Sequence, residues 1–154
     1  MRVYTIGFAG KSAAAFFAKL QEAGVAKLVD VRRNSNTLYG GFTRARDLPY
    51  FLQHLCNVPY AHEPEFAPSA ELLREYQGRI RKNKKDPDAW PDYVRRFADE
   101  LATRPILELF ARHAAGVANV CFLCTEPTPE KCHRRLLAEY IRDHADAGLE
   151  IVHL

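Results

Sequence analysis

The segment RVYTIGFAGKSAAAFFAKLQEAGVAKLVDV (residues 2–31) decides the fold. It opens with a short β-rich run that stops at Gly7. Ser12 is a suitable N-cap for a helix over residues 13–23, whose apolar side chains recur with helical spacing. Residues 25–31 then form a second β-rich run. This order predicts a β-α-β unit, in which two parallel strands are joined by a right-handed crossover.

The rest of the chain continues the alternation of helical and strand-like segments. Further helices are expected over residues 48–56, 69–80, 90–102, 106–115 and 130–145. Further strands are expected over residues 117–125 and 150–154, and residues 60–63 fit a short strand or an extended loop. The last helix has Thr128 as its expected N-cap and Pro129 at its first position. The pattern predicts one α/β domain over residues 1–154, a three-layer arrangement with a mostly parallel sheet and helices on both faces.

Composition limits the classes of function. A chain of 154 residues is long enough for one domain with a true core. The net charge of +3 is compatible with phosphate-bearing partners without requiring them. No apolar run approaches the ~18 residues of a membrane span, and the N-terminus lacks a signal-peptide pattern. The four cysteines are too few for a disulfide scaffold, so we expect a cytoplasmic protein with reduced thiols and no membrane partner.

Reactive side chains follow the predicted strands where each of them ends. Ligands of open α/β sheets bind outside the carboxyl ends of the strands. Gly7 follows the first strand, and Asp30 ends the second, with Arg32 and Arg33 directly after it. The strand over residues 117–125 leads into the densest cluster of such residues, which contains Cys124, Glu126, Cys132, His133 and Arg134. The sequence therefore predicts a functional site at this edge of the sheet.

Several of these motifs resemble those of the DUF488 family. They are Thr5-Ile-Gly7, Leu28-Val-Asp-Val-Arg32, Cys124-x-Glu126 followed by Cys132-His-Arg134, and the final Ile151-Val-His-Leu154. The resemblance covers nearly the whole chain and implies a single α/β domain of bacterial or archaeal type, without an assigned activity. Many members have His-Ser after the first Thr-Ile-Gly, where this chain has Phe8-Ala9, so a role for that histidine is absent here.

The favoured chemistry is acid–base catalysis on an anionic substrate. Asp30 and Glu126 lie at or just beyond strand ends, and two such carboxylates can divide the roles of acid and base. The anion is expected to bind near the start of the last helix, because helix amides and guanidinium groups suit phosphate. Its expected ligands are Gly7, Arg32, Arg33, His133 and Arg134. Tyr39, in a loop that follows the second strand, is a candidate lid residue, and His62 is a candidate for the same cleft.

A thiol mechanism is an alternative. Cys124 at a strand end is similar to a rhodanese or tyrosine-phosphatase layout. Such sites need backbone N–H groups around the sulfur, whereas the loop here contains Pro127 and Pro129 and no glycine. Cys132 is the better thiol candidate on this reasoning, because it lies in the expected first turn of a helix beside His133.

A metal site is a further alternative. Cys124, Cys132 and His133, with His62 or His153, could supply zinc ligands. Their spacing is wider than the short Cys-x-x-Cys pattern, so no metal is included in the favoured interpretation.

The sequence thus favours a small enzyme, a hydrolase or a transferase, acting on a phosphate-bearing substrate related to nucleotides or nucleic acids. The main rival is a non-catalytic nucleic-acid-binding module that uses basic loops. The sequence identifies no cofactor.

Overall fold

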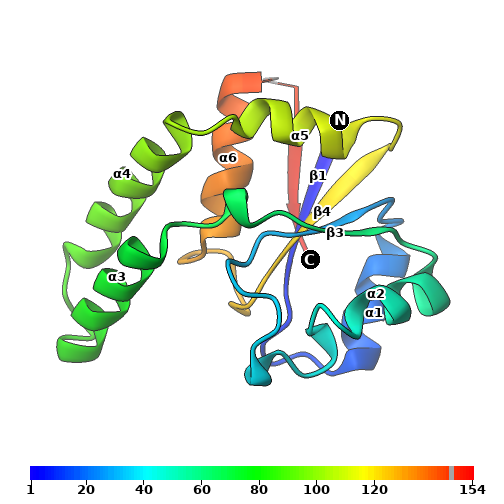
Figure 1. Ribbon diagram of the computed structural model, residues 1–154, viewed down its shortest axis with the longest axis horizontal. Helices are drawn as coiled ribbons and strands as arrows, with labels where there is room; N and C mark the ends of the chain where they lie inside the picture. Colours follow the sequence, from blue (N-terminus) through cyan, green and yellow to red (C-terminus); the bar gives the residue numbers. More distant parts are fainter. Residues whose placement is uncertain (146–147) are drawn as a thin grey trace.

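The chain forms one five-stranded sheet in which the strand order is β3-β2-β4-β1-β5 (Figure 1). The structure is a computed structural model that describes residues 1–145 and 148–154. Every neighbouring pair of strands is parallel. The strands are β1 (Arg2–Gly7), β2 (Leu28–Asp30), β3 (Tyr60–His62), β4 (Asn119–Cys124) and β5 (Glu150–His153).

Helices follow the strands in the predicted alternation. They are α1 (Ala13–Glu22), α2 (Leu48–Phe51), α3 (Ala70–Lys82), α4 (Ala89–Ala102), α5 (Ile106–Ala114) and α6 (His133–Ala145). Short 3-10 turns span Leu38–Thr43 and Pro64–Phe66, and a π turn over Leu52–Cys56 continues α2. None of the helices in the described ranges is both long and apolar enough to cross a membrane.

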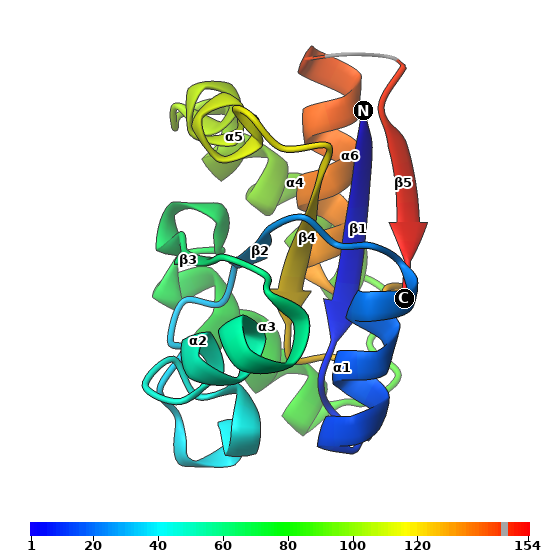
Figure 2. The ribbon, with the colours of Figure 1, turned by 90° about the vertical axis from the view of Figure 1, so that its right-hand side faces the viewer.

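Two apolar clusters on opposite faces of the sheet confirm the three-layer prediction (Figure 2). Phe16 and Leu20 of α1 pack on one face, and Phe97 of α4, Phe110 of α5 and Leu137 of α6 pack on the other. Side chains of β1 and β4 are buried on both faces, as expected of central parallel strands.

The strands of the first β-α-β unit are parallel but are not neighbours, because β4 lies between β1 and β2. This order places Gly7 opposite Cys124, and Asp30 opposite Leu123. The ends of three strands, which lie far apart in the sequence, therefore meet at one edge of the sheet.

Helices α3 and α4 pack on each other and extend beyond that edge of the sheet (Figure 1). The Ser69 side chain accepts a hydrogen bond from Leu72 N–H as the N-cap of α3, and its hydroxyl also donates to Glu100 of α4. The two helices meet through the rings of Tyr76, Trp90 and Tyr93.

The predicted start of the last helix is wrong. Helix α6 begins at His133, and Thr128 is not its N-cap. The chain before it turns irregularly, with Cys132 N–H donating to the Pro129 carbonyl. The carbonyl of Glu126 accepts a hydrogen bond from the Arg134 side chain, which ties the loop before α6 to the first turn of that helix.

Candidate functional site

A cavity of about 700 Å³ opens between the ends of β2 and β4 and the inner side of α3 and α4. Its floor is formed by the residues that follow the two strands, and its outer wall by the two helices. Among the predicted site residues, those that line it are Arg32, Arg33, Cys124, Glu126, Cys132 and His133. The cavity therefore lies at the edge of the sheet where the sequence predicts a functional site, and the function of that site stays a prediction.

Cys124 ends β4 at the bottom of this cavity, with 4% of its surface exposed. Hydrogen bonding from Cys132 is the largest effect that lowers the pKa of the Cys124 thiol, and burial opposes it. The backbone N–H groups of Thr125 and Glu126 and the positive charge of Arg134 lower this pKa further. These two N–H groups precede Pro127, and Pro127 and Pro129 add none, as expected from the sequence.

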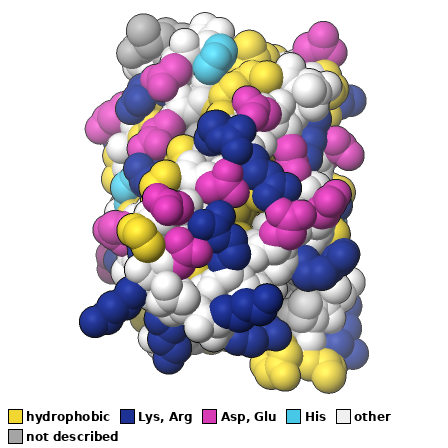
Figure 3. Space-filling view, turned by 90° about the vertical axis from the view of Figure 1, so that its left-hand side faces the viewer, with side chains coloured by type: hydrophobic (Ala, Val, Ile, Leu, Met, Phe, Trp, Pro, Cys, Tyr) yellow, Lys and Arg dark blue, Asp and Glu magenta, His cyan; other side chains and the backbone are white. Residues whose placement is uncertain are grey.

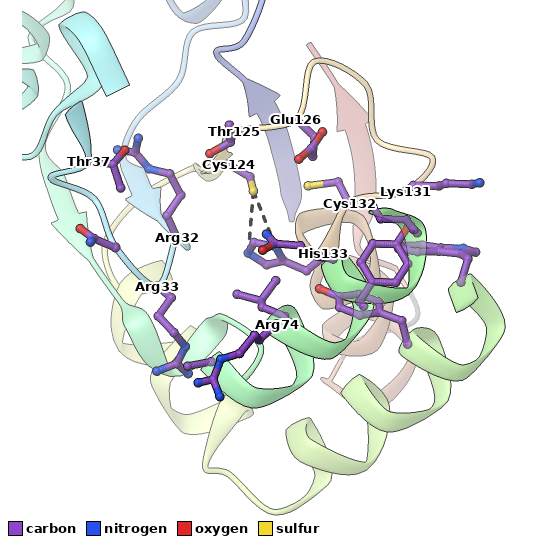
Figure 4. Close-up of a pocket in the computed structure, with 18 residues that line it drawn as sticks. Arg32, Arg33, Thr37, Arg74, Cys124, Thr125, Glu126, Lys131, Cys132 and His133 are labelled. Carbon is purple, nitrogen blue, oxygen red and sulfur yellow. Dashed lines mark hydrogen bonds between the residues drawn. The ribbon is translucent and has the colours of Figure 1, made fainter. Parts of the chain in front are cut away.

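His133, the first residue of α6, lies beside this sulfur (Figure 4). Its Nε2 is 2.9 Å from the Val31 carbonyl oxygen. Because a carbonyl oxygen only accepts, Nε2 carries the proton, and Nδ1 is free to accept one. The Cys124 sulfur is 3.6 Å from Nδ1 and 3.9 Å from Nε2. These nearly equal distances place the sulfur beside the ring, not on the lone-pair axis of Nδ1.

The same three side chains are the candidate metal ligands in the described part of the chain. One donor atom each from Cys124, Cys132 and His133 lies within 4.8 Å of the others. A zinc ion shared by sulfur and imidazole sits on the nitrogen lone-pair axis, about 2.0 Å from nitrogen and 2.3 Å from sulfur. With the sulfur beside the ring, the arrangement does not fit such an ion without reorienting His133.

Arg134 connects the Cys-His-Arg motif to the Thr-Ile-Gly motif behind the cavity. Its side chain is 1% exposed, and Nη1 donates to the Glu126 carbonyl over 2.7 Å, while Nε lies 3.4 Å from Thr5 Oγ1. Within the described ranges no carboxylate lies within ion-pair distance of it. A Cβ at Gly7 would be 1.6 Å from the Glu126 carbonyl oxygen, so only glycine allows the loop this close. Gly7 thus holds the loop and does not line the cavity.

Asp30 is enclosed in a hydrogen-bonded network at the end of β2. Its carboxylate is fully buried and accepts from Arg32 Nε over 2.8 Å and from Arg32 Nη2 over 2.6 Å. Tyr60 donates to the same carboxylate, and Arg32 also donates to the Thr43 carbonyl and hydroxyl. Asp30 does not line the cavity, and burial together with the Asp30 charge raises the pKa of the Tyr60 hydroxyl.

Three other cations line the cavity without an acidic partner in the described part of the chain. They are Arg33, Arg74 and Lys131. Arg33 is anchored by its Nε, which donates to the Pro68 carbonyl over 2.6 Å, so the end of its guanidinium group is left for a ligand. Figure 4 shows Arg33 and Arg74 extending toward the same edge of the cavity, with Lys131 at the other side. Unpaired cations around a cavity favour an anionic ligand.

The outer wall of the cavity was missed by sequence reasoning. Trp90 and Tyr93 stack with ring centroids 5.2 Å apart, and Tyr76 packs against both. The signal was present in α3, where the cavity-lining residues recur at helical spacing; they are Ala70, Leu73, Arg74, Tyr76, Gln77 and Ile80. The helical periodicity of the sequence defines this face of α3, but it does not show that the face forms the wall of a cavity.

Of the remaining predicted site residues, Tyr39 and His62 lie outside the cavity lining, and Glu126 lies at the cavity mouth. Tyr39 is 94% exposed and does not line the cavity. His62 Nε2 donates to the Arg32 carbonyl over 2.7 Å, which joins the loop after β2 to the end of β3. Glu126 is exposed at the cavity mouth, and no ion-pair partner for it occurs in residues 1–145 or 148–154.

Comparison with known proteins gives one match, to a family model. No curated protein and no solved structure matches the chain. The family model described as domain of unknown function DUF488 matches residues 12–141, which include both strand ends and every residue that lines the cavity. The chain therefore belongs to the DUF488 family.

Proposed function

We propose that this protein is a thiol-dependent enzyme in which Cys124 attacks an anionic, phosphate-bearing substrate. The observation that supports it most is the environment of the Cys124 sulfur, which combines hydrogen-bond donors that favour the thiolate with an opening into a cavity of unpaired cations. The thiolate is the nucleophilic form of cysteine, and thiol nucleophiles in enzymes are activated by such surroundings.

The cavity supports a division of roles. Arg33, Arg74 and Lys131 bind the phosphate, and the rings of Tyr76 and Trp90 provide an apolar wall for a planar group such as a nucleobase. His133 accepts the thiol proton at Nδ1 once its ring turns toward the sulfur, since hydrogen bonds of this kind tighten when substrate binds.

The two carboxylates receive different roles in this proposal. Glu126 keeps the acid–base role predicted for it, because its exposed carboxylate at the cavity mouth can reach a leaving group. Asp30 positions Arg32 and does not exchange protons with substrate, since its oxygens are already hydrogen-bonded.

The nucleic-acid-binding alternative is supported less well. Figure 3 shows acidic and basic side chains interspersed over the upper part of the face that carries α3 and α4, and basic side chains alone toward its lower end. Within the basic segment 79–85, Arg79 pairs with Asp86 and Asp92. A nucleic-acid backbone needs a continuous basic surface.

The test is alkylation of Cys124, followed by peptide mapping. For each cysteine, the rate of reaction with anionic iodoacetate is divided by the rate with neutral iodoacetamide. We expect this ratio to be about tenfold higher for Cys124 than for the partly buried Cys56, because the cations of the cavity attract the anionic reagent. Adenosine monophosphate should protect Cys124, and adenosine should protect it much less. Turnover on a panel of nucleotide phosphates should disappear in Cys124→Ser and Glu126→Gln. An unreactive Cys124, or turnover that survives Cys124→Ser, would overturn the proposal.

A further inference from the structure

Cys132 is a second thiol at the same site, and the proposed function gives it no step in the reaction. It immediately precedes α6, is 2% exposed, and lies with its sulfur within 4.8 Å of the Cys124 sulfur. The two remaining cysteines lie apart from this pair. Cys121 packs into the cluster on the opposite face of the sheet, and Cys56 contacts the Phe17 carbonyl.

The two sulfurs lie within 4.8 Å of each other, so the ionisation of one thiol affects the other. The neighbouring Cys132 side chain lowers the pKa of Cys124. The neighbouring Cys124 side chain, with burial second, raises the pKa of Cys132. One thiol therefore ionises readily and its neighbour retains the proton. Dithiol centres that exchange disulfides use this division, with one attacking thiol and one that acts afterwards.

We propose that Cys124 and Cys132 form a redox-active dithiol that exchanges with small anionic disulfides, with Cys132 as the resolving thiol. The proposal rests on the nucleophilic role proposed for Cys124. Disulfide formation requires the sulfurs to approach to about 2 Å. Only the short loop 125–131 separates the two cysteines in the chain, and both line the same cavity.

The reaction balances in two steps. The Cys124 thiolate attacks one sulfur of the small disulfide, the S–S bond breaks, and one thiolate leaves while a mixed disulfide forms on Cys124. Cys132 then gives its proton to His133 or water and attacks the Cys124 sulfur, which expels the second thiolate. The small disulfide is reduced to two thiols and the protein pair is oxidised to one disulfide.

The cavity selects the charge of the reagent. Its unpaired cations, Arg33, Arg74 and Lys131, should favour a negatively charged disulfide over a neutral one. The dianionic aromatic disulfide dithiobis(nitrobenzoate) and the uncharged dithiodipyridine are suitable probes, because both release a coloured thiol.

The experiment uses the full chain with Cys56→Ser as background. We expect rapid release of two equivalents of thionitrobenzoate per protein and a product that carries no adduct and has lost two hydrogen atoms. Cys132→Ser should release one equivalent and keep the adduct on Cys124. Cys132→Ala serves as a second variant and should behave as Cys132→Ser does. The rate of Cys124 relative to that of free cysteine should be lower with the uncharged probe than with the dianionic one.

The outcomes separate this proposal from the proposed function. A stable adduct on Cys124 of the Cys56→Ser protein, after release of one equivalent, leaves the nucleophile in place and overturns the resolving role. No release from Cys124 overturns both proposals. One equivalent of zinc in the purified protein, with both thiols protected until it is removed, would show a metal site and overturn the dithiol.

Discussion

The ends of β2 and β4 lie side by side, yet the positive charges at the two ends are balanced to different degrees. At the end of β2, Asp30 and Arg32 form a buried ion pair whose remaining hydrogen bonds are supplied by Thr43 and Tyr60. At the end of β4, Cys124 is surrounded by donors and by the charge of Arg134, and the cavity beside it holds further cations. The first site is complete within the chain, whereas the second has an excess of positive charge. This excess is the reason for proposing that the β4 end binds an anionic ligand.

Removing Asp30 should have the largest effect on folding. Asp30→Ala leaves Arg32 buried without its partner, which should lower the free energy of unfolding by about 3–5 kcal/mol. Asp99→Ala is the matched control, because the Asp99 and Arg95 side chains are exposed, and it should cost less than about 1 kcal/mol. Urea denaturation measures both. Equal, small losses would show that the β2 network is not a closed structural unit.

Gly7→Ala should affect the β4 end through the loop. A Cβ at this position overlaps the Glu126 carbonyl, so we expect a loss of about 1–3 kcal/mol in unfolding free energy. Alkylation of Cys124 should also slow, because the displaced loop carries two of its N–H donors. Gly78→Ala in α3 has open space around its Cβ and should instead stabilise the protein by about 0.5–1 kcal/mol. Unchanged alkylation in Gly7→Ala would contradict the role of the loop.

Arg74→Ala should change ligand attraction without changing stability. Arg74 is exposed and has no ion-pair partner in the described ranges, so the free energy of unfolding should change by no more than about 0.5 kcal/mol. The preference of Cys124 for iodoacetate over iodoacetamide should fall severalfold. Arg81→Ala, on the same helix but outside the cavity lining, should preserve it. Equal effects of the two variants would mean that the cavity cations do not act on the ligand.

The strand ends could be predicted because local patterns determine them. The apolar run before Cys124 and the run before Asp30 identified both strands, and the rule for open α/β sheets placed their ends together. The N–H groups of Thr125 and Glu126 are also evident in the sequence, because the first proline of the loop is Pro127.

The rest of the site depends on contacts between distant segments. Arg74 and Trp90 reach the cavity only because α3 and α4 fold across the strand ends, and helical periodicity does not specify that partner. The pairing of Asp30 with Arg32 could be foreseen from their spacing, but the closure of this network by Thr43 and Tyr60 could not. The irregular loop before α6 likewise involves a side-chain contact that periodicity does not specify, the hydrogen bond from Arg134 to the Glu126 carbonyl.

The central claim is that Cys124 ionises unusually easily, and the most direct test is the pH dependence of its alkylation. Iodoacetamide rates, resolved by peptide, should be measured for Cys124 and Cys56 in the same wild-type sample. The ionised thiol is the form that reacts, so a lowered pKa moves the rise in rate to lower pH. The account predicts a midpoint for Cys124 below the usual value of about 8.5 and a midpoint for Cys56 above it, because burial raises the pKa of Cys56. A Cys124 midpoint at or above that of Cys56 would contradict the account.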